Sequence, residues 1–112
     1  MDKIKELLVN IKDITSRYGL EIYHIDYTSV TLITRFGITP DIFIQLYANI
    51  KKEKLNMALI VSGNRIYGID KEGGFYHEHP FNNPEAHIKT DPVGAEEFVI
   101  KSLEYLKKLG FL

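Results

Sequence analysis

Residues 42–61 read IFIQLYANIKKEKLNMALIV, and this stretch decides the fold. From residue 42 to 47 every even position is large and apolar, and from 55 to 61 every odd position is. Because side chains alternate between the two faces of a strand, this pattern predicts two strands that share one hydrophobic face. The second face is partly apolar too, through Phe43, Tyr47 and Ile60, which indicates a cover that is either a helix or another subunit.

Further short runs of β-branched and aromatic residues lie on both sides of this pair, separated by turn residues. Their connections are too short to hold crossover helices, so neighbouring runs are expected to pair antiparallel. Gly63-Asn64 suits a two-residue primed turn. The sequence therefore predicts an antiparallel β-meander of five to six strands, at residues 20–27, 30–36, 42–48, 55–61, 65–69 and 75–79.

Both ends of the chain have the pattern of an amphipathic helix. Apolar residues recur at three- and four-residue steps through residues 2–18, and Gly19 follows where a left-handed cap is favourable. Near the other end, Asp91 is a candidate N-cap and Pro92 suits the first helical position, with helical spacing up to Gly110. An N-terminal and a C-terminal helix that flank a meander predict an α+β fold, with residues 1–112 as a single domain.

Composition limits the class of protein. With 112 residues, of which 45% are apolar, the chain can bury a core, which excludes intrinsic disorder. The 14 Lys and Arg nearly balance the 15 Asp and Glu, so no chain-wide basic field exists to drive nucleic-acid binding. The lack of cysteine excludes disulfides, thiolate zinc sites and a cysteine nucleophile. The N-terminus has no uninterrupted apolar run, which predicts a cytoplasmic protein without a membrane partner.

Three of the four histidines fall within residues 77–87, the main polar concentration of the chain. If residues 75–79 are extended, His77 and His79 lie on one face about 6.5 to 7 Å apart, and Tyr76 lies on the other. The segment from 80 to 84 contains two prolines and two asparagines, so it is expected to form a turn or rigid loop. Such a loop can bring Glu85 and His87 back over the histidine pair. The remaining histidine, His24, is expected to be an ordinary sheet residue.

One chemistry that fits this group is metal binding. His77, His79 and His87 would bind zinc or a similar divalent transition metal through neutral ring nitrogens, with Glu85 or Asp91 as a further ligand or support. The local charge favours a cation, because residues 70–97 contain seven acidic groups and two basic ones.

The other chemistry is acid–base catalysis without a metal. Two of the histidines would act as base and acid on a phosphate-containing substrate, with Tyr76 and Lys89 near the transferred group. A purely structural interpretation also stays open, in which the histidines belong to a solvated sheet face and a hydrogen-bonding cap.

The second half of the chain resembles the TumE-type toxin components of prokaryotic toxin–antitoxin systems. The resemblance rests on Tyr67-Gly68-Ile69-Asp70, Phe75-Tyr76-His77-Glu78-His79-Pro80, Asn82-Asn83-Pro84 and His87. The family pattern tends to place an acidic residue and asparagine before its proline and histidines, whereas His77 and His79 here precede the two asparagines. The resemblance implies a toxin that acts on RNA or a nucleotide-linked target and is neutralised by a cognate antitoxin protein.

Two functions of different class follow from these patterns. The first is a toxin-like protein that acts on RNA or another phosphate-containing substrate through the histidine cluster. The alternative is a non-catalytic binding or assembly module, which forms a homodimer or binds a partner protein through its second sheet face.

Overall fold

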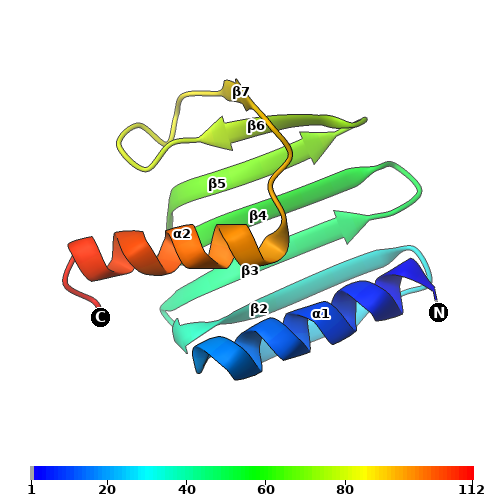
Figure 1. Ribbon diagram of the computed structural model, residues 1–112, viewed down its shortest axis with the longest axis horizontal. Helices are drawn as coiled ribbons and strands as arrows, with labels where there is room; N and C mark the ends of the chain where they lie inside the picture. The colour runs from blue at the N-terminus through cyan, green and yellow to red at the C-terminus, as the bar shows by residue number, and fades with distance from the viewer. Residues whose placement is uncertain (1) are drawn as a thin grey trace.

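The computed structural model describes residues 2–112 and contains one antiparallel sheet with two helices (Figure 1). Each strand pairs with the next, so the order of strands in the sheet is their order in the chain. The elements are α1 (Lys3–Tyr18), β1 (Glu21–Tyr27), β2 (Thr31–Thr39), β3 (Ile42–Asn49), β4 (Lys54–Val61), β5 (Asn64–Glu72), β6 (Phe75–His79), β7 (Ile88–Thr90) and α2 (Ala95–Lys108). The predicted α+β meander between two helices is confirmed. The sheet has seven strands rather than five to six, because residues 88–90 add β7 to its edge.

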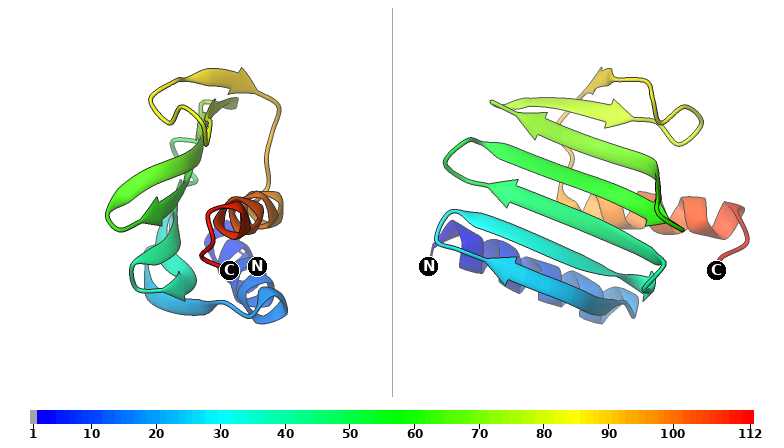
Figure 2. Two further views of the ribbon diagram at one scale, coloured as in Figure 1. Left: turned by 90° about the vertical axis from the view of Figure 1, so that its left-hand side faces the viewer. Right: turned by 180° about the vertical axis from the view of Figure 1, so that it is seen from behind.

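Both helices pack on the same face of the sheet (Figure 2). Helix α1 contacts β1 and β2, and α2 contacts β4. The residues that alternate toward this face, such as Leu46, Met57 and Leu59, are buried against Ile11 of α1 and Phe98 of α2. We call this side the helix face and the opposite side, over which neither helix lies, the open face. The second face predicted to be partly apolar is the open face, and a helix is therefore not its cover.

Helix α1 covers the predicted segment and ends at the predicted Gly19 cap, with Asp2 as its N-cap rather than its first residue. The Asp2 carboxylate accepts a hydrogen bond from the backbone N–H of Lys5 at 2.8 Å and caps the first turn. Gly19 ends the helix with φ of 69°, a left-handed conformation that suits glycine. Arg17, in the last turn, forms a bidentate ion pair with Glu96, with oxygen–nitrogen distances of 2.6 and 3.1 Å, and so ties α1 to the start of α2.

The predicted start of the last helix and the predicted turn after β4 are wrong. Helix α2 begins at Ala95 with Gly94 as N-cap, not at Asp91-Pro92, because residues 91–94 carry the chain from β7 at the sheet edge to the helix layer (Figure 1). The two-residue turn between β4 and β5 consists of Ser62 and Gly63 rather than Gly63-Asn64. Both turn residues have positive φ, 50° and 81°, as a primed turn requires, while Asn64 already pairs with Val61.

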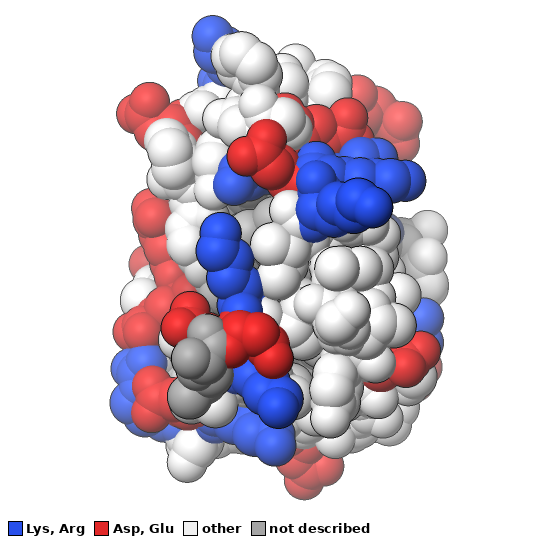
Figure 3. Space-filling view, turned by 90° about the vertical axis from the view of Figure 1, so that its right-hand side faces the viewer, with Lys and Arg blue, Asp and Glu red and all other residues white. Residues whose placement is uncertain are grey.

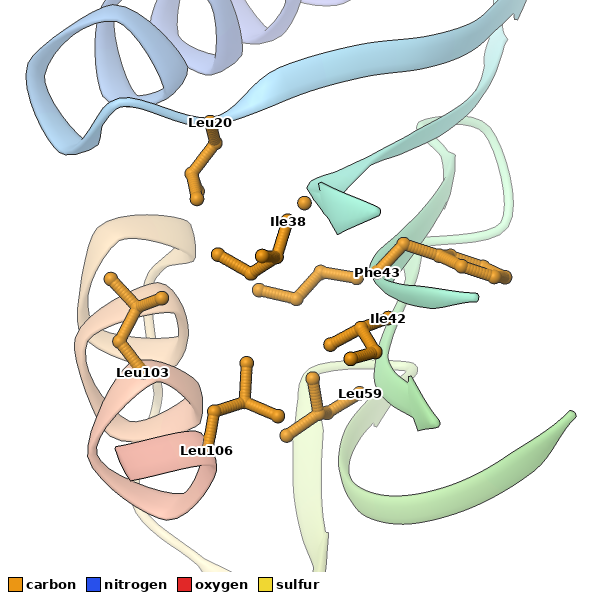
Figure 4. A pocket seen from close by; sticks show the side chains of 9 residues that line it. Leu20, Ile38, Ile42, Phe43, Leu59, Leu103 and Leu106 are labelled. Atoms are coloured by element: carbon orange, nitrogen blue, oxygen red, sulfur yellow. The ribbon is translucent and has the colours of Figure 1, made fainter. Parts of the chain in front are cut away.

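The end of the sheet under α2 is packed with aliphatic side chains (Figure 4). The crevice there is lined by apolar residues, and its volume of about 10 Å³ is about that of one water probe. The Phe43 ring points away from this crevice, toward the open face (Figure 4). Gly37 permits the close approach of β2 and β3, because a Cβ at this position would lie 2.5 Å from the Ile42 carbonyl oxygen. Within residues 2–112, no helix is both long and apolar enough to cross a bilayer.

Candidate functional site

The pairing of three neighbouring strands gathers polar side chains on the open face. Asp70 of β5 pairs with His77 of β6, which in turn pairs with Lys89 of β7. Gly68 pairs with His79 in the same way. Because paired residues share a face and side chains alternate along a strand, Asp70, His77, His79 and Lys89 all lie on the open face.

The loop between β6 and β7 returns the chain to this face, as the proline and asparagine content predicts. Two successive turns shape it, with the Asn83 N–H donating to the Pro80 carbonyl at 3.1 Å and the Ala86 N–H to the Asn83 carbonyl at 3.0 Å. Phe81 anchors the loop by stacking on Tyr105 of α2, with ring centroids 4.5 Å apart. His87 follows directly after these turns.

The three predicted imidazole rings lie together. His87 stacks against His79 at a centroid distance of 4.9 Å and an interplanar angle of 17°. The rings of His87 and His77 lie with their centroids 4.3 Å apart and an interplanar angle of 36°. His87 is exposed and His77 half-buried, whereas His79 is buried. The structure therefore brings together the three histidines that the sequence singled out, and their chemical role stays a prediction.

His79 is held at both ring nitrogens. Its Nε2 lies 2.9 Å from Oδ2 of Asp70, and its Nδ1 lies 3.1 Å from the carbonyl oxygen of Pro84. The Nη2 atom of Arg65 is slightly farther from Nδ1, at 3.3 Å, and is 3.4 Å from the same carbonyl. Nδ1 therefore faces both a carbonyl, which only accepts, and a guanidinium, which only donates, while the Asp70 carboxylate accepts from Nε2–H.

Asp70 is the site residue that the sequence prediction missed. The candidate metal-binding group consists of Asp70, His79 and His87, whose ligand atoms all lie within 4.8 Å of one another. The sequence signal that could have found Asp70 is the pair Gly73-Gly74, which is typical of a hairpin tip, because a two-residue turn there places Asp70 opposite His77. The predicted strand ended at Ile69, whereas β5 continues for three more residues to Glu72 and so includes Asp70.

Several predicted site residues lie elsewhere. Tyr76 lies on the helix face, opposite His77 and His79 as the alternation predicts, and packs against the core under Lys71; its role near the transferred group stays a prediction. Glu85 and Asp91 are exposed, and neither belongs to the group of converging ligand atoms. Lys89 does share the open face, and its Nζ lies 5.6 Å from the centre of the Phe75 ring.

The folded chain also separates the charges that are adjacent in sequence. Glu78 alternates to the helix face. Glu96 and Glu97 belong to α2, which packs on that same side of the sheet (Figure 2). The acidic balance of residues 70–97 therefore does not describe the open face, where Arg65 and Lys89 lie near the histidines and Asp70 is already bonded to His79.

A second polar feature lies at the end of the molecule that carries the N-terminus. Lysine and arginine side chains gather there, interrupted by acidic ones (Figure 3). A hollow of about 240 Å³ in this region is lined by Lys3, Lys54 and Lys71, together with Glu53 and residues 48–50. Lys54 lies 3.7 Å from Glu72, so part of this positive charge is already paired.

A search of protein-family models, curated proteins and solved structures finds no match to this chain. The resemblance to TumE-type toxins therefore stays a prediction from the sequence.

Proposed function

We propose that the chain is a toxin-like protein that cleaves RNA, or acts on another phosphate-containing substrate, by acid–base chemistry on its open face. The observation that carries this proposal is the stack of His77, His87 and His79, with His79 fixed by two hydrogen bonds. Imidazole is the side chain whose ordinary pKa range allows both proton uptake and proton release near neutral pH.

The contacts of each histidine indicate its role. His79 is buried and bonded at both ring nitrogens, so it acts as a positioning residue that supports the ring of His87. His77 and His87 are the accessible pair. One of them, as neutral imidazole, removes the proton of a ribose 2′-hydroxyl, whose oxygen attacks the adjacent phosphorus. The other, as imidazolium, gives its proton to the departing 5′-oxygen.

Nearby cations suit the charge that develops on the phosphate. Lys89 pairs with His77 across β6 and β7, and the Arg65 guanidinium lies beside the ring of His79. Positive groups held next to a reacting phosphate stabilise its transition state, since they need little reorganisation. This placement supports an anionic substrate despite the overall acidity of residues 70–97.

The rest of the open face suits a single-stranded nucleic acid. Phe43 and Tyr47 alternate onto this face from β3, and the Arg35 guanidinium lies 5.7 Å from the centre of the Phe43 ring. Aromatic and guanidinium groups on a sheet surface stack unpaired bases, in the way that four-stranded RNA-binding modules do. A polymer can span from these rings to the histidines, which lie three strands away at roughly 4.8 Å per strand.

The proposal is tested by RNA turnover with single-histidine variants. We expect His87→Ala and His77→Ala to lower the rate by at least about 100-fold, the lower range of a general acid or base. His24→Ala is the matched control, because His24 is also exposed but lies on β1 at the far edge of the sheet. Equal rates for His87→Ala and the wild type, or no turnover of single-stranded RNA by the wild type, would contradict the proposal.

The open face also favours a second candidate function, assembly with another copy of this chain. Ile33, Phe43, Tyr47 and Ile60 give this face an apolar strip that neither helix covers. Light scattering across a dilution series is the test, with Ile60→Glu as the variant and Val9→Glu, on the exposed side of α1, as control. A dimer that Ile60→Glu alone dissociates supports assembly, and a monomer at all concentrations contradicts it.

A further inference from the structure

We propose that Asp70, His79 and His87 bind a divalent transition metal, with zinc as the reference ion. The three residues come from β5, from β6 and from the loop before β7, and their ligand atoms lie within 4.8 Å of one another. Two imidazole nitrogens and one carboxylate oxygen form a ligand set that zinc accepts, with one position left for water. This site differs from the set predicted from the sequence, which lacked Asp70 and included His77 and Glu85.

The hydrogen bonds of His79 prepare it as a ligand. When Nε2 binds a metal, Nδ1 carries the ring hydrogen and donates it to the Pro84 carbonyl, 3.1 Å away, in a ring orientation that directs Nε2 at the Asp70 carboxylate. Metal-binding histidines commonly donate their second ring N–H to a carbonyl or carboxylate in this way. The backbone of the loop thus holds the ring when the metal is bound.

The contact between His79 and Asp70 holds a hydrogen at the place where a metal can bind. Nε2 lies 2.9 Å from Oδ2, and a carboxylate oxygen can only accept, so Nε2 carries the hydrogen of this bond. A proton on Nε2 satisfies this contact, and a metal ion can replace that proton. Metal binding then keeps the two side chains where they already face each other and places the ion between them.

The distances fit zinc after small movements. With Zn–N and Zn–O bonds of about 2.0–2.2 Å, two tetrahedral ligand atoms lie roughly 3.3 Å apart. The 2.9 Å between Nε2 and Oδ2 therefore needs to open only slightly. The ligand nitrogen of His87 moves inward by roughly 1.5 Å at most to reach the same spacing, and the exposed side chain of His87 has room for this movement.

The metal site does not rest on the proposed cleavage of RNA, although both use His87. A metal held by His87 would withdraw that ring from acid–base chemistry, so zinc is expected to slow RNA turnover if both proposals are correct. Binding can be measured without any substrate. The metal titration therefore tests the metal site alone, and RNA turnover tests the cleavage proposal alone.

The test is a metal titration of the full chain, prepared without a polyhistidine tag and freed of metal with a chelator. Zinc binding is followed by calorimetry, and cobalt binding by its visible absorption, which reports coordination geometry. We expect one ion per chain, and affinity lowered more than about 100-fold in Asp70→Asn and His87→Ala, since loss even of outer partners costs about 10–100-fold. Glu85→Gln and His24→Ala, two exposed residues outside the group, should bind as the wild type does.

Two results would overturn the site. One is a wild-type chain that binds neither ion at millimolar concentration. The other is unchanged affinity in both Asp70→Asn and His87→Ala, or loss of binding in Glu85→Gln. Because His87 is exposed, its substitution leaves the fold intact, and far-UV circular dichroism checks this for Asp70→Asn. In the wild type, the nitrogen-15 signal of His79 Nε2 should shift on zinc addition while Nδ1 carries the ring hydrogen.

Discussion

The bond between Asp70 and His79 should couple the two residues energetically, and a double-mutant cycle measures this coupling. The perturbations are Asp70→Ala, His79→Ala and the double variant. A hydrogen bond to a charged group contributes about 1.5–3 kcal/mol to stability, and partial exposure lowers this value. The side chains are 11% and 27% exposed, so water screens the pair only in part. We therefore expect a coupling energy of about 1–2 kcal/mol.

Urea unfolding at neutral pH, followed by circular dichroism, gives the four free energies of unfolding. Removal of the His79 ring leaves the same cavity whether residue 70 is Asp or Ala, so the cost of the cavity largely cancels from the coupling energy. Asp70→Ala combined with His24→Ala is the control pair, because their strands are four positions apart in the sheet and their effects should add. A coupling below about 0.5 kcal/mol for Asp70 and His79 would show that the bond does not fix the ring, and the positioning role would be wrong.

Three further perturbations test the fold. Ile11→Ala, in the core, should lower the free energy of unfolding by about 2–5 kcal/mol, whereas Val9→Ala, 56% exposed on the same helix, should change it by less than about 0.5 kcal/mol, as urea midpoints will show. Gly37→Ala should lower the free energy of unfolding by about 3 kcal/mol or more, the upper end of the cost of overpacking, because the new Cβ meets backbone atoms. Thermal melting measures this loss. Hydrogen bonds from Arg17 lower the pKa of Glu96 from 4.5 to about 2, so its stabilisation is complete above pH 4.5 and disappears as the pH falls to about 2. The difference in urea midpoint between the wild type and Glu96→Gln should shrink over this range, and a difference independent of pH would contradict the role of the ion pair.

The sequence predicts most of the sheet because its pattern is local. Alternation in β3 and β4 identifies the helix face residue by residue, and the buried Leu46 and Leu59 confirm it. Strand β7 has only three residues and no alternation to detect, and it forms because β6 offers an edge to pair with. The start of α2 was misplaced for a similar reason: the distance from the sheet edge to the helix layer overrides the capping signal at Asp91.

The part of the candidate site that follows from the two-residue alternation of a strand was predicted, and the part that follows from how neighbouring strands pair was not. Period two alone puts His77 and His79 on one face, and the proline-rich loop implies the return of His87. The partner of His79 depends on which residues form the turn between β5 and β6. Once Gly73 and Gly74 occupy that turn, Asp70 comes to lie beside the histidines, on the same face.

Residues 70–97 are acidic as a segment, yet the open face carries Arg65 and Lys89 beside the histidines. These cations give a prediction for how the affinity for RNA depends on salt. For single strands, the slope of log affinity against log salt is about −0.7 for each phosphate neutralised. Arg65 and Lys89, with Arg35 farther along the open face, give two or three contacts and a slope of roughly −1.4 to −2.1. Fluorescence anisotropy with labelled RNA measures this slope, with His87→Ala as the protein because its expected slow turnover preserves the RNA during the measurement. The proposal is contradicted if the slope stays unchanged in Arg65→Gln but becomes less negative by about 0.7 in Lys3→Gln. The RNA would then bind at the lysine-lined hollow and not on the open face.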